Sequence, residues 1–147
     1  MEVIMENDSV KLLRECDAGI KMGVSSIDEI LENVTDGQMK QILKDSRQEH
    51  CKLEREIEGY LNKYSEPEKE PAPVAKAMSW MKTNIKLAMK DSDKTAADLI
   101  TDGCNMGVKT LHRYLNQYPA AENKIRSLAE KLAGIEERLA RDMRVYL

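Results

Sequence analysis

The sequence predicts an all-α protein: a bundle of two antiparallel helical hairpins, joined by a long crossover that carries an extra helix. Three observations predict it. Apolar residues recur at helical steps of three and four along most of the chain, a glycine motif occurs twice, and a proline-rich stretch separates the two halves. The 147 residues are enough for one domain with its own core, so we expect a single domain over 1–147.

The glycine motif Gly-x-x-Met-Gly-Val begins at Gly19 and again at Gly103, so that Gly23 and Gly107 correspond. A glycine inside a helix costs about 1 kcal/mol relative to alanine, so four such residues in two matching places indicate one structural need met twice. We expect that need to be close packing of two helices. The motif therefore predicts that the helices containing Gly23 and Gly107 cross there, at the low end of the usual 8–10 Å axis separation.

The first hairpin is predicted from two amphipathic stretches, 9–34 and 38–64. Asn7, Asp8 or Ser9 can cap the first, and the Thr-Asp-Gly sequence that ends at Gly37 separates the two. Polar residues, Ser46 and His50, interrupt the apolar stripe of the second stretch. We expect His50 to be a buried, hydrogen-bonded core histidine that carries no metal.

The second half begins with a linker over 65–73, which contains three prolines and alternating charges. Helices are then predicted over 73–90, 93–118 and 121–146. The helix over 73–90 would span about 25 Å, close to the length of the bundle. It is therefore expected to be the crossover, which lets the helices over 38–64 and 93–118 run parallel. The helices over 93–118 and 121–146 repeat the first hairpin. When the Tyr-Leu pair at the end of 38–64 is aligned with the Tyr-Leu pair at the end of the chain, Leu53 matches Leu139.

The pattern is similar to the small, uncharacterised bacterial ferritin-like bundles, a domain-of-unknown-function group. It consists of Leu12-Leu13, Gly19, Gly23-Val24, Trp80 and Tyr114-Leu115. The similarity covers nearly the whole chain from Val10 onward. It implies a ferritin-like four-helix bundle with one long crossover, and relatives that hold two metal ions.

The ligands of a di-metal centre do not carry over to this sequence. Such a bundle needs a Glu from each of two helices and a Glu-x-x-His from each of the other two, because residues three apart face the same ion. Here Glu49 and His50 are adjacent, which turns them about 100° apart on a helix. The other histidine, His112, has no such partner either. We therefore expect no cofactor.

A degenerate site is the alternative, and its candidate ligands are Asp17, His50, Asp102 and Glu136. Iron, manganese or zinc would be its metal. Against it, Asp17 and Asp102 fall on opposite sides of the bundle midpoint, roughly 12 Å apart by the helix rise.

Composition excludes several function classes. A net charge of −3 argues against a general nucleic-acid binder, and the chain lacks an apolar run long enough to span a membrane. The first ten residues do not have the pattern of a signal peptide. Cys16, Cys51 and Cys104 are odd in number and widely spaced, which favours neither disulfides nor a Cys-x-x-Cys metal site. These features indicate a cytoplasmic protein.

Two functions follow as hypotheses. The first is a non-catalytic helical bundle that acts through self-association as a homo-oligomer or by binding a protein partner. The alternative is a ferritin-like metalloprotein with an atypical iron, manganese or zinc site. The sequence names no substrate, and no phosphate-binding loop or catalytic triad pattern occurs in it.

Overall fold

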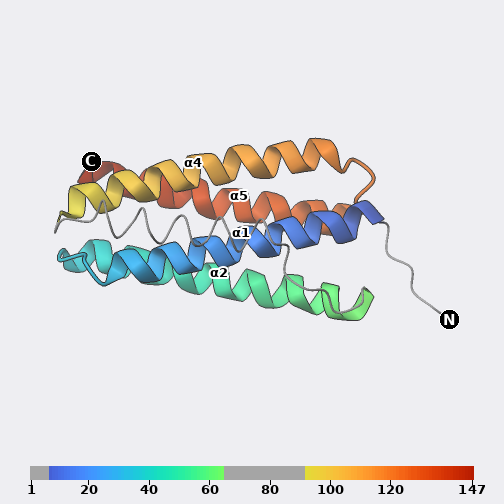
Figure 1. Ribbon diagram of the computed structural model, residues 1–147, viewed down its shortest axis with the longest axis horizontal. Helices are drawn as coiled ribbons and strands as arrows, with labels where there is room; N and C mark the ends of the chain where they lie inside the picture. The colour runs from blue at the N-terminus through green and yellow to red at the C-terminus, as the bar shows by residue number, and fades with distance from the viewer. Residues whose placement is uncertain (1–6, 65–91) are drawn as a thin grey trace.

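A computed structural model describes residues 7–64 and 92–147, and these residues form four long helices (Figure 1). They are α1 (Asn7–Leu31), α2 (Gly37–Tyr64), α4 (Asp93–Gln117) and α5 (Asn123–Met143), followed by the short 3₁₀ helix η1 (Arg144–Tyr146). The described residues contain no strand, so the prediction of an all-α bundle is confirmed. The expected linker 65–73 and the helix expected over 73–90, with Trp80, lie outside the described residues.

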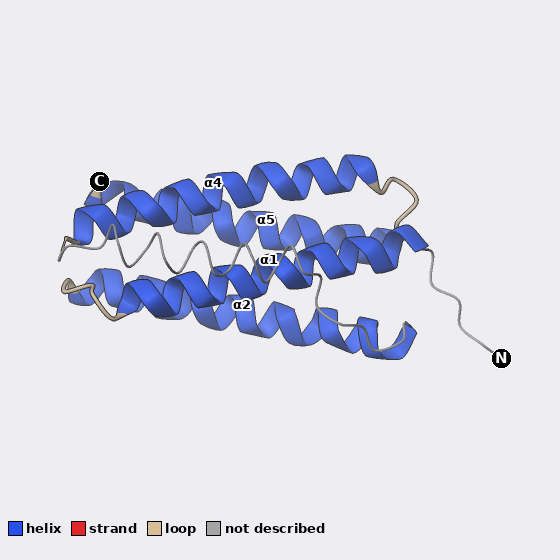
Figure 2. Cartoon of the chain, in the orientation of Figure 1, coloured by secondary structure: helices blue, strands red, loops and turns tan. Residues whose placement is uncertain are grey.

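The helix directions agree with the predicted topology. In Figure 1, α1 and α5 run one way along the bundle, while α2 and α4 run the other way. The short loops of the two hairpins lie at opposite ends (Figure 2). Helix α2 ends at one end of the bundle, and α4 begins at the other end. The predicted parallel pair, α2 and α4, is therefore present.

Helix boundaries follow from local hydrogen bonds. The Asp36 carboxylate accepts from the backbone N–H of Met39 at 2.8 Å, which caps α2. Helix α1 ends at Leu31, three residues before the predicted end at 34. The backbone turns there, since the N–H of Asn33 donates to the carbonyl of Ile30. Val34 misled the prediction because its side chain is still buried in the core, although its backbone has left the helix.

Each hairpin also forms hydrogen bonds with the loop of the other hairpin. The backbone N–H groups of Thr35 and Asp36, in the α1–α2 loop, donate to the Asp93 carboxylate at the start of α4. At the opposite end, the N–H of Glu122, just before α5, donates to the hydroxyl of Ser9 in the first turn of α1 at 2.8 Å. These contacts fix the two hairpins against each other at both ends of the bundle.

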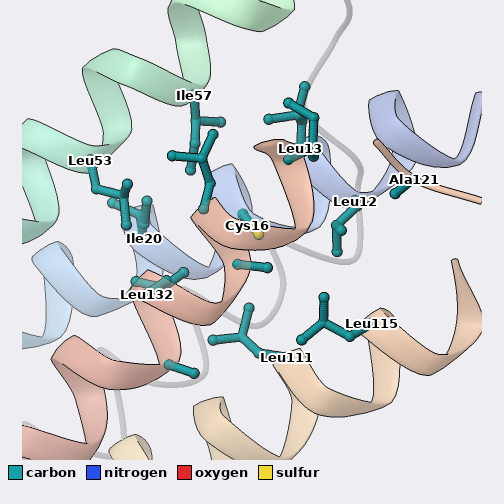
Figure 3. Close-up of a cluster of buried hydrophobic side chains, with 14 of the residues drawn as sticks. Leu12, Leu13, Cys16, Ile20, Leu53, Ile57, Leu111, Leu115, Ala121 and Leu132 are labelled. Atoms are coloured by element: carbon teal, nitrogen blue, oxygen red, sulfur yellow. The ribbon is translucent and has the colours of Figure 1, made fainter. Parts of the chain in front are cut away.

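The hydrophobic core consists of two clusters with a polar layer between them. Figure 3 shows the first cluster, where side chains of all four helices meet around Cys16, Leu111 and Leu132. The second cluster lies toward the other end and includes Ile27, Leu43 and Leu139. In each helix, the residues between the two clusters contain a glycine or a polar side chain: Gly23, Ser46, His50, Gly107 and Glu136.

The predicted crossing of α1 and α4 at the glycines is wrong. A Cβ atom on Gly23 would meet His50, and one on Gly107 would meet Glu136, with no atom of the opposite glycine's helix among the nearest neighbours. Gly19 and Gly103 have nothing within 4 Å of such an atom, so neither allows a close approach of helices. The motif provides space for side chains of the polar layer rather than for a second backbone.

Candidate functional site

The structure brings together two of the four predicted site residues. His50 of α2 and Glu136 of α5 face each other, with 4.0 Å between Nε2 and Oε1. Asp102 is exposed on α4, away from the core. Asp17 is on α1, where its carboxylate forms an ion pair with Lys21 at 2.9 Å. The four residues therefore do not form one site, but the His50–Glu136 pair does form in the middle of the bundle.

One ring nitrogen of His50 is fixed by the backbone. Its Nδ1 lies 2.7 Å from the carbonyl oxygen of Ser46, one turn earlier in α2. A carbonyl oxygen only accepts, so Nδ1 must carry a hydrogen and donate it. Nε2 is then the atom that faces Glu136. The prediction of a buried His50 beside Ser46 is confirmed, since only 2% of His50 is exposed.

Glu136 is the less satisfied member of the pair. It is 8% exposed, and its Oε2 is buried without a hydrogen-bond partner. Burial raises the pKa of Glu136, while the nearby His50 acts in the opposite direction. The 4.0 Å separation from Nε2 exceeds hydrogen-bond length, so His50 does not satisfy the carboxylate by a direct hydrogen bond. A carboxyl group in this position favours its neutral form more than an exposed one does.

The two glycines of the polar layer make room for this pair. A Cβ on Gly23 would lie 3.4 Å from the His50 ring, which is ordinary contact. A Cβ on Gly107 would overlap the Glu136 carboxylate, so this carboxylate occupies the space that a side chain would fill. Extending the repeat that matches Leu53 with Leu139 also matches His50 with Glu136. That register was the signal in the sequence that could have separated this pair from Asp17 and Asp102, the other two candidate ligands.

The pair does not fit two metal ions. His50 and Glu136 supply one nitrogen and one carboxylate, whereas the di-metal bundles use four carboxylates and two histidines. Cys16 and Cys104 are buried, and burial together with nearby carboxylates, Glu136 among them, raises the pKa of each thiol to about 12. Both thiols therefore stay protonated at neutral pH and are poor ligands and nucleophiles.

A second polar cluster was not predicted from the sequence. Carboxylate oxygens of Asp17, Glu54 and Glu58, from α1 and α2, all lie within 4.8 Å of one another. Burial, together with the charges of Glu58 and Asp17, raises the pKa of Glu54. Lys21 is 2.9 Å from Asp17 and 3.9 Å from Glu58, so its ammonium group already supplies a cation to this cluster.

The surface has a charged groove between α2 and α5. It encloses about 520 Å³. Two of its lining residues, Leu53 and Ile135, are buried and apolar, and most of the others are charged. Its full lining consists of Glu49, Lys52, Leu53, Lys131, Gly134, Ile135, Arg138 and Arg141. Four of these eight residues are cationic, in a protein whose net charge is −3.

Comparison with known proteins shows the fold. A crystal structure of a DUF305 fragment from Deinococcus radiodurans superposes with a TM-score of 0.75 over 97% of this chain and 97% of that chain. The two sequences are 13% identical, so the likeness concerns the fold alone. No family model matches the chain, and no curated protein matches it. Within the described residues, no helix combines the length and the apolar character needed to cross a bilayer.

Proposed function

We propose that this bundle acts by association, through the groove between α2 and α5, and not as a catalyst. One observation carries the proposal: the acid–base pair is sealed inside the bundle, while the groove is open. His50 is 2% exposed and Glu136 is 8% exposed, so a substrate has no access to them in this conformation. Catalysis by an acid or base needs the group within hydrogen-bond reach of the reacting atom.

The groove has the features of a binding surface. Leu53 and Ile135 give it an apolar floor, and charged side chains surround that floor. Gly134 leaves the middle open, because a Cβ atom built there would have no neighbour within 4 Å. An apolar centre with a polar rim is the usual anatomy of an interface.

Gly134→Trp tests this proposal because the added side chain begins in open space and its indole would occupy the groove. Gly103→Trp is the matched control, since Gly103 also faces open space, but on α4. We expect sedimentation velocity of the wild type to show self-association as concentration rises. Gly134→Trp should abolish it and Gly103→Trp should retain it. A wild type that stays monomeric up to about 1 mM would contradict the self-association form of the proposal.

The second candidate is a metalloprotein with an atypical site. It is favoured by one observation: Nε2 of His50 and a carboxylate of Glu136 with an unpartnered oxygen meet from different hairpins. His50 and Glu136 would supply one nitrogen and one carboxylate ligand to a zinc ion, and tetrahedral coordination would require the two atoms to come closer than their 4.0 Å separation. Elemental analysis of protein purified without a chelator tests it. Stoichiometric iron, manganese or zinc that is lost in His50→Ala would support this candidate over the first.

A further inference from the structure

We infer that the groove between α2 and α5 binds a small polyanion, which Lys52 and Arg141 contact. This inference goes beyond the proposed function, because it assigns a small-molecule ligand to the same groove, where the ligand would compete with a protein partner. The argument depends on three features of the groove: its framing by ion pairs, its unpaired cations and its size.

Two ion pairs between the helices frame the groove. Arg138 of α5 donates to Glu49 of α2 at 2.6 Å, and Lys131 lies 3.8 Å from Glu56. On each helix the two positions are seven residues apart, which corresponds to roughly 10 Å along the axis. Gly134 lies between the two pairs and contributes no side chain. The framed space is therefore open in its middle.

Two cations of the groove have no such partner. Within the described residues, neither Lys52 nor Arg141 has a carboxylate at ion-pair distance. The same ion-pair register places Lys52 near the level of Gly134, in the open middle. Arg141 lies one turn beyond Arg138, so a ligand that contacts both cations must extend past the Arg138–Glu49 pair. Ion pairs between the helices thus neutralise Arg138 and Lys131, but the charges of Lys52 and Arg141 are not neutralised. A ligand with at least two negative groups would neutralise them.

The size of the groove selects the class of ligand. A volume of about 520 Å³ falls within the range of small-molecule sites, about 300–1,000 Å³. Guanidinium groups bind phosphate and carboxylate in a two-point geometry, and an ammonium group adds a point charge. The ligand is therefore a small molecule that carries two or more phosphate or carboxylate groups.

The test is calorimetric titration of the full chain with tripolyphosphate and, separately, with citrate, at low ionic strength. Binding of tripolyphosphate alone assigns phosphate chemistry, and binding of citrate alone assigns carboxylate chemistry. The double variant Lys52→Gln/Arg141→Gln should weaken binding at least tenfold. The matched control is Lys109→Gln/Arg113→Gln, which removes the same two charges from exposed positions on α4. This control should change affinity less than threefold.

Several outcomes would overturn the inference. They are the absence of binding of either anion to the wild type, equal losses in the two double variants, or undiminished binding in Gly134→Trp. If no anion binds but Gly134→Trp abolishes self-association, the inference fails and the proposed function stands. If an acidic peptide binds in the groove where both small anions fail, the groove binds a protein partner and the small-ligand class is wrong. If the protein binds neither anion nor the peptide and does not self-associate, both the inference and the proposed function fail.

Discussion

The two hairpins solve the same packing problem with opposite chemistry. In the α1–α2 hairpin, Gly23 faces the base His50; in the α4–α5 hairpin, Gly107 faces the acid Glu136. A Cβ atom added to Gly23 would be at normal contact distance from the His50 ring. At Gly107, the Glu136 carboxylate already occupies the position that such an atom would take. The comparison shows that one backbone device, a glycine in mid-helix, accommodates either a ring or a carboxylate.

The energetic difference between the hairpins follows from hydrogen bonding. His50 donates to the Ser46 carbonyl within its own helix, so the first hairpin satisfies its polar residue internally. Oε2 of Glu136 has no such partner. A buried polar atom without a hydrogen bond costs about 1–3 kcal/mol. We therefore infer that the second hairpin depends on the first to stabilise its acid, while the reverse dependence is weaker.

The largest expected effect comes from removing the base. His50→Leu should lower the free energy of unfolding by about 3 kcal/mol, because it leaves Glu136 buried without its partner. Adding Glu136→Met should restore stability to within about 1 kcal/mol of the wild type, since an apolar pair replaces a buried polar pair. Urea denaturation of the single and double variants measures this. Additive effects would show that the two residues are not coupled.

The glycines should respond differently to alanine. Gly107→Ala should destabilise by about 1 kcal/mol, the low end of overpacking costs, because its Cβ must displace the Glu136 carboxylate at the flexible end of that side chain. Gly23→Ala should be neutral or stabilise by up to about 1 kcal/mol, since its Cβ fits and alanine favours the helix. Thermal denaturation compares them. In a Glu136→Ala background, Gly107→Ala should become stabilising; if it does not, its cost has another origin.

The acid should also give the second hairpin a pH dependence. The pKa of Glu136 is raised in the folded state, so its contribution to stability is fully present below its unfolded pKa and is lost as pH rises through the folded pKa. At neutral pH, Glu136→Gln should therefore be more stable than the wild type, because the amide carries no charge that burial disfavours. The gap should close as pH falls toward the usual pKa of a glutamate. Urea midpoints at several pH values check this, and a gap independent of pH would contradict it.

The sequence was sufficient for the fold because the helix signals are local. Apolar periodicity and caps placed four helices to within a few residues, and the length of the predicted crossover helix indicated that α2 and α4 are parallel. It also placed His50 in the core from its position beside Ser46. These inferences use neighbours along one helix, where spacing determines direction.

The candidate site was harder to predict because it depends on contacts between helices. Glycine periodicity shows that space is needed, but not what fills it, so the crossing at Gly23 and Gly107 was the wrong choice. The groove and the cluster of Asp17, Glu54 and Glu58 arise where two helices meet, and the relative rotation of the helices is not local information. The repeat alone could have related His50 to Glu136.

The smallest expected effects concern the ties at the two ends of the bundle, where the hairpins again differ. Ser9 is fully buried and uncharged, and its hydroxyl accepts from Glu122. Asp93 is charged and solvent-accessible, and the backbone N–H of Thr35, with the Thr35 hydroxyl and the N–H of Asp36, lowers its pKa. A lowered folded pKa contributes stability that is present above the unfolded pKa and is lost as pH falls through the folded one.

Ser9→Ala should therefore cost about 1 kcal/mol at neutral and at acidic pH alike. Asp93→Asn should cost about 0.5 kcal/mol at neutral pH, a value kept small by solvent screening. This cost should begin to fall near the ordinary pKa of an aspartate and disappear below the lowered folded pKa, where the wild-type carboxyl is itself neutral. Urea midpoints of both variants at two pH values decide the matter. If Asp93→Asn still lowers the free energy of unfolding by the full amount in acid, the Asp93 contact depends on hydrogen-bond geometry rather than on charge. The contacts at Asp93 and Ser9 would then be chemically alike.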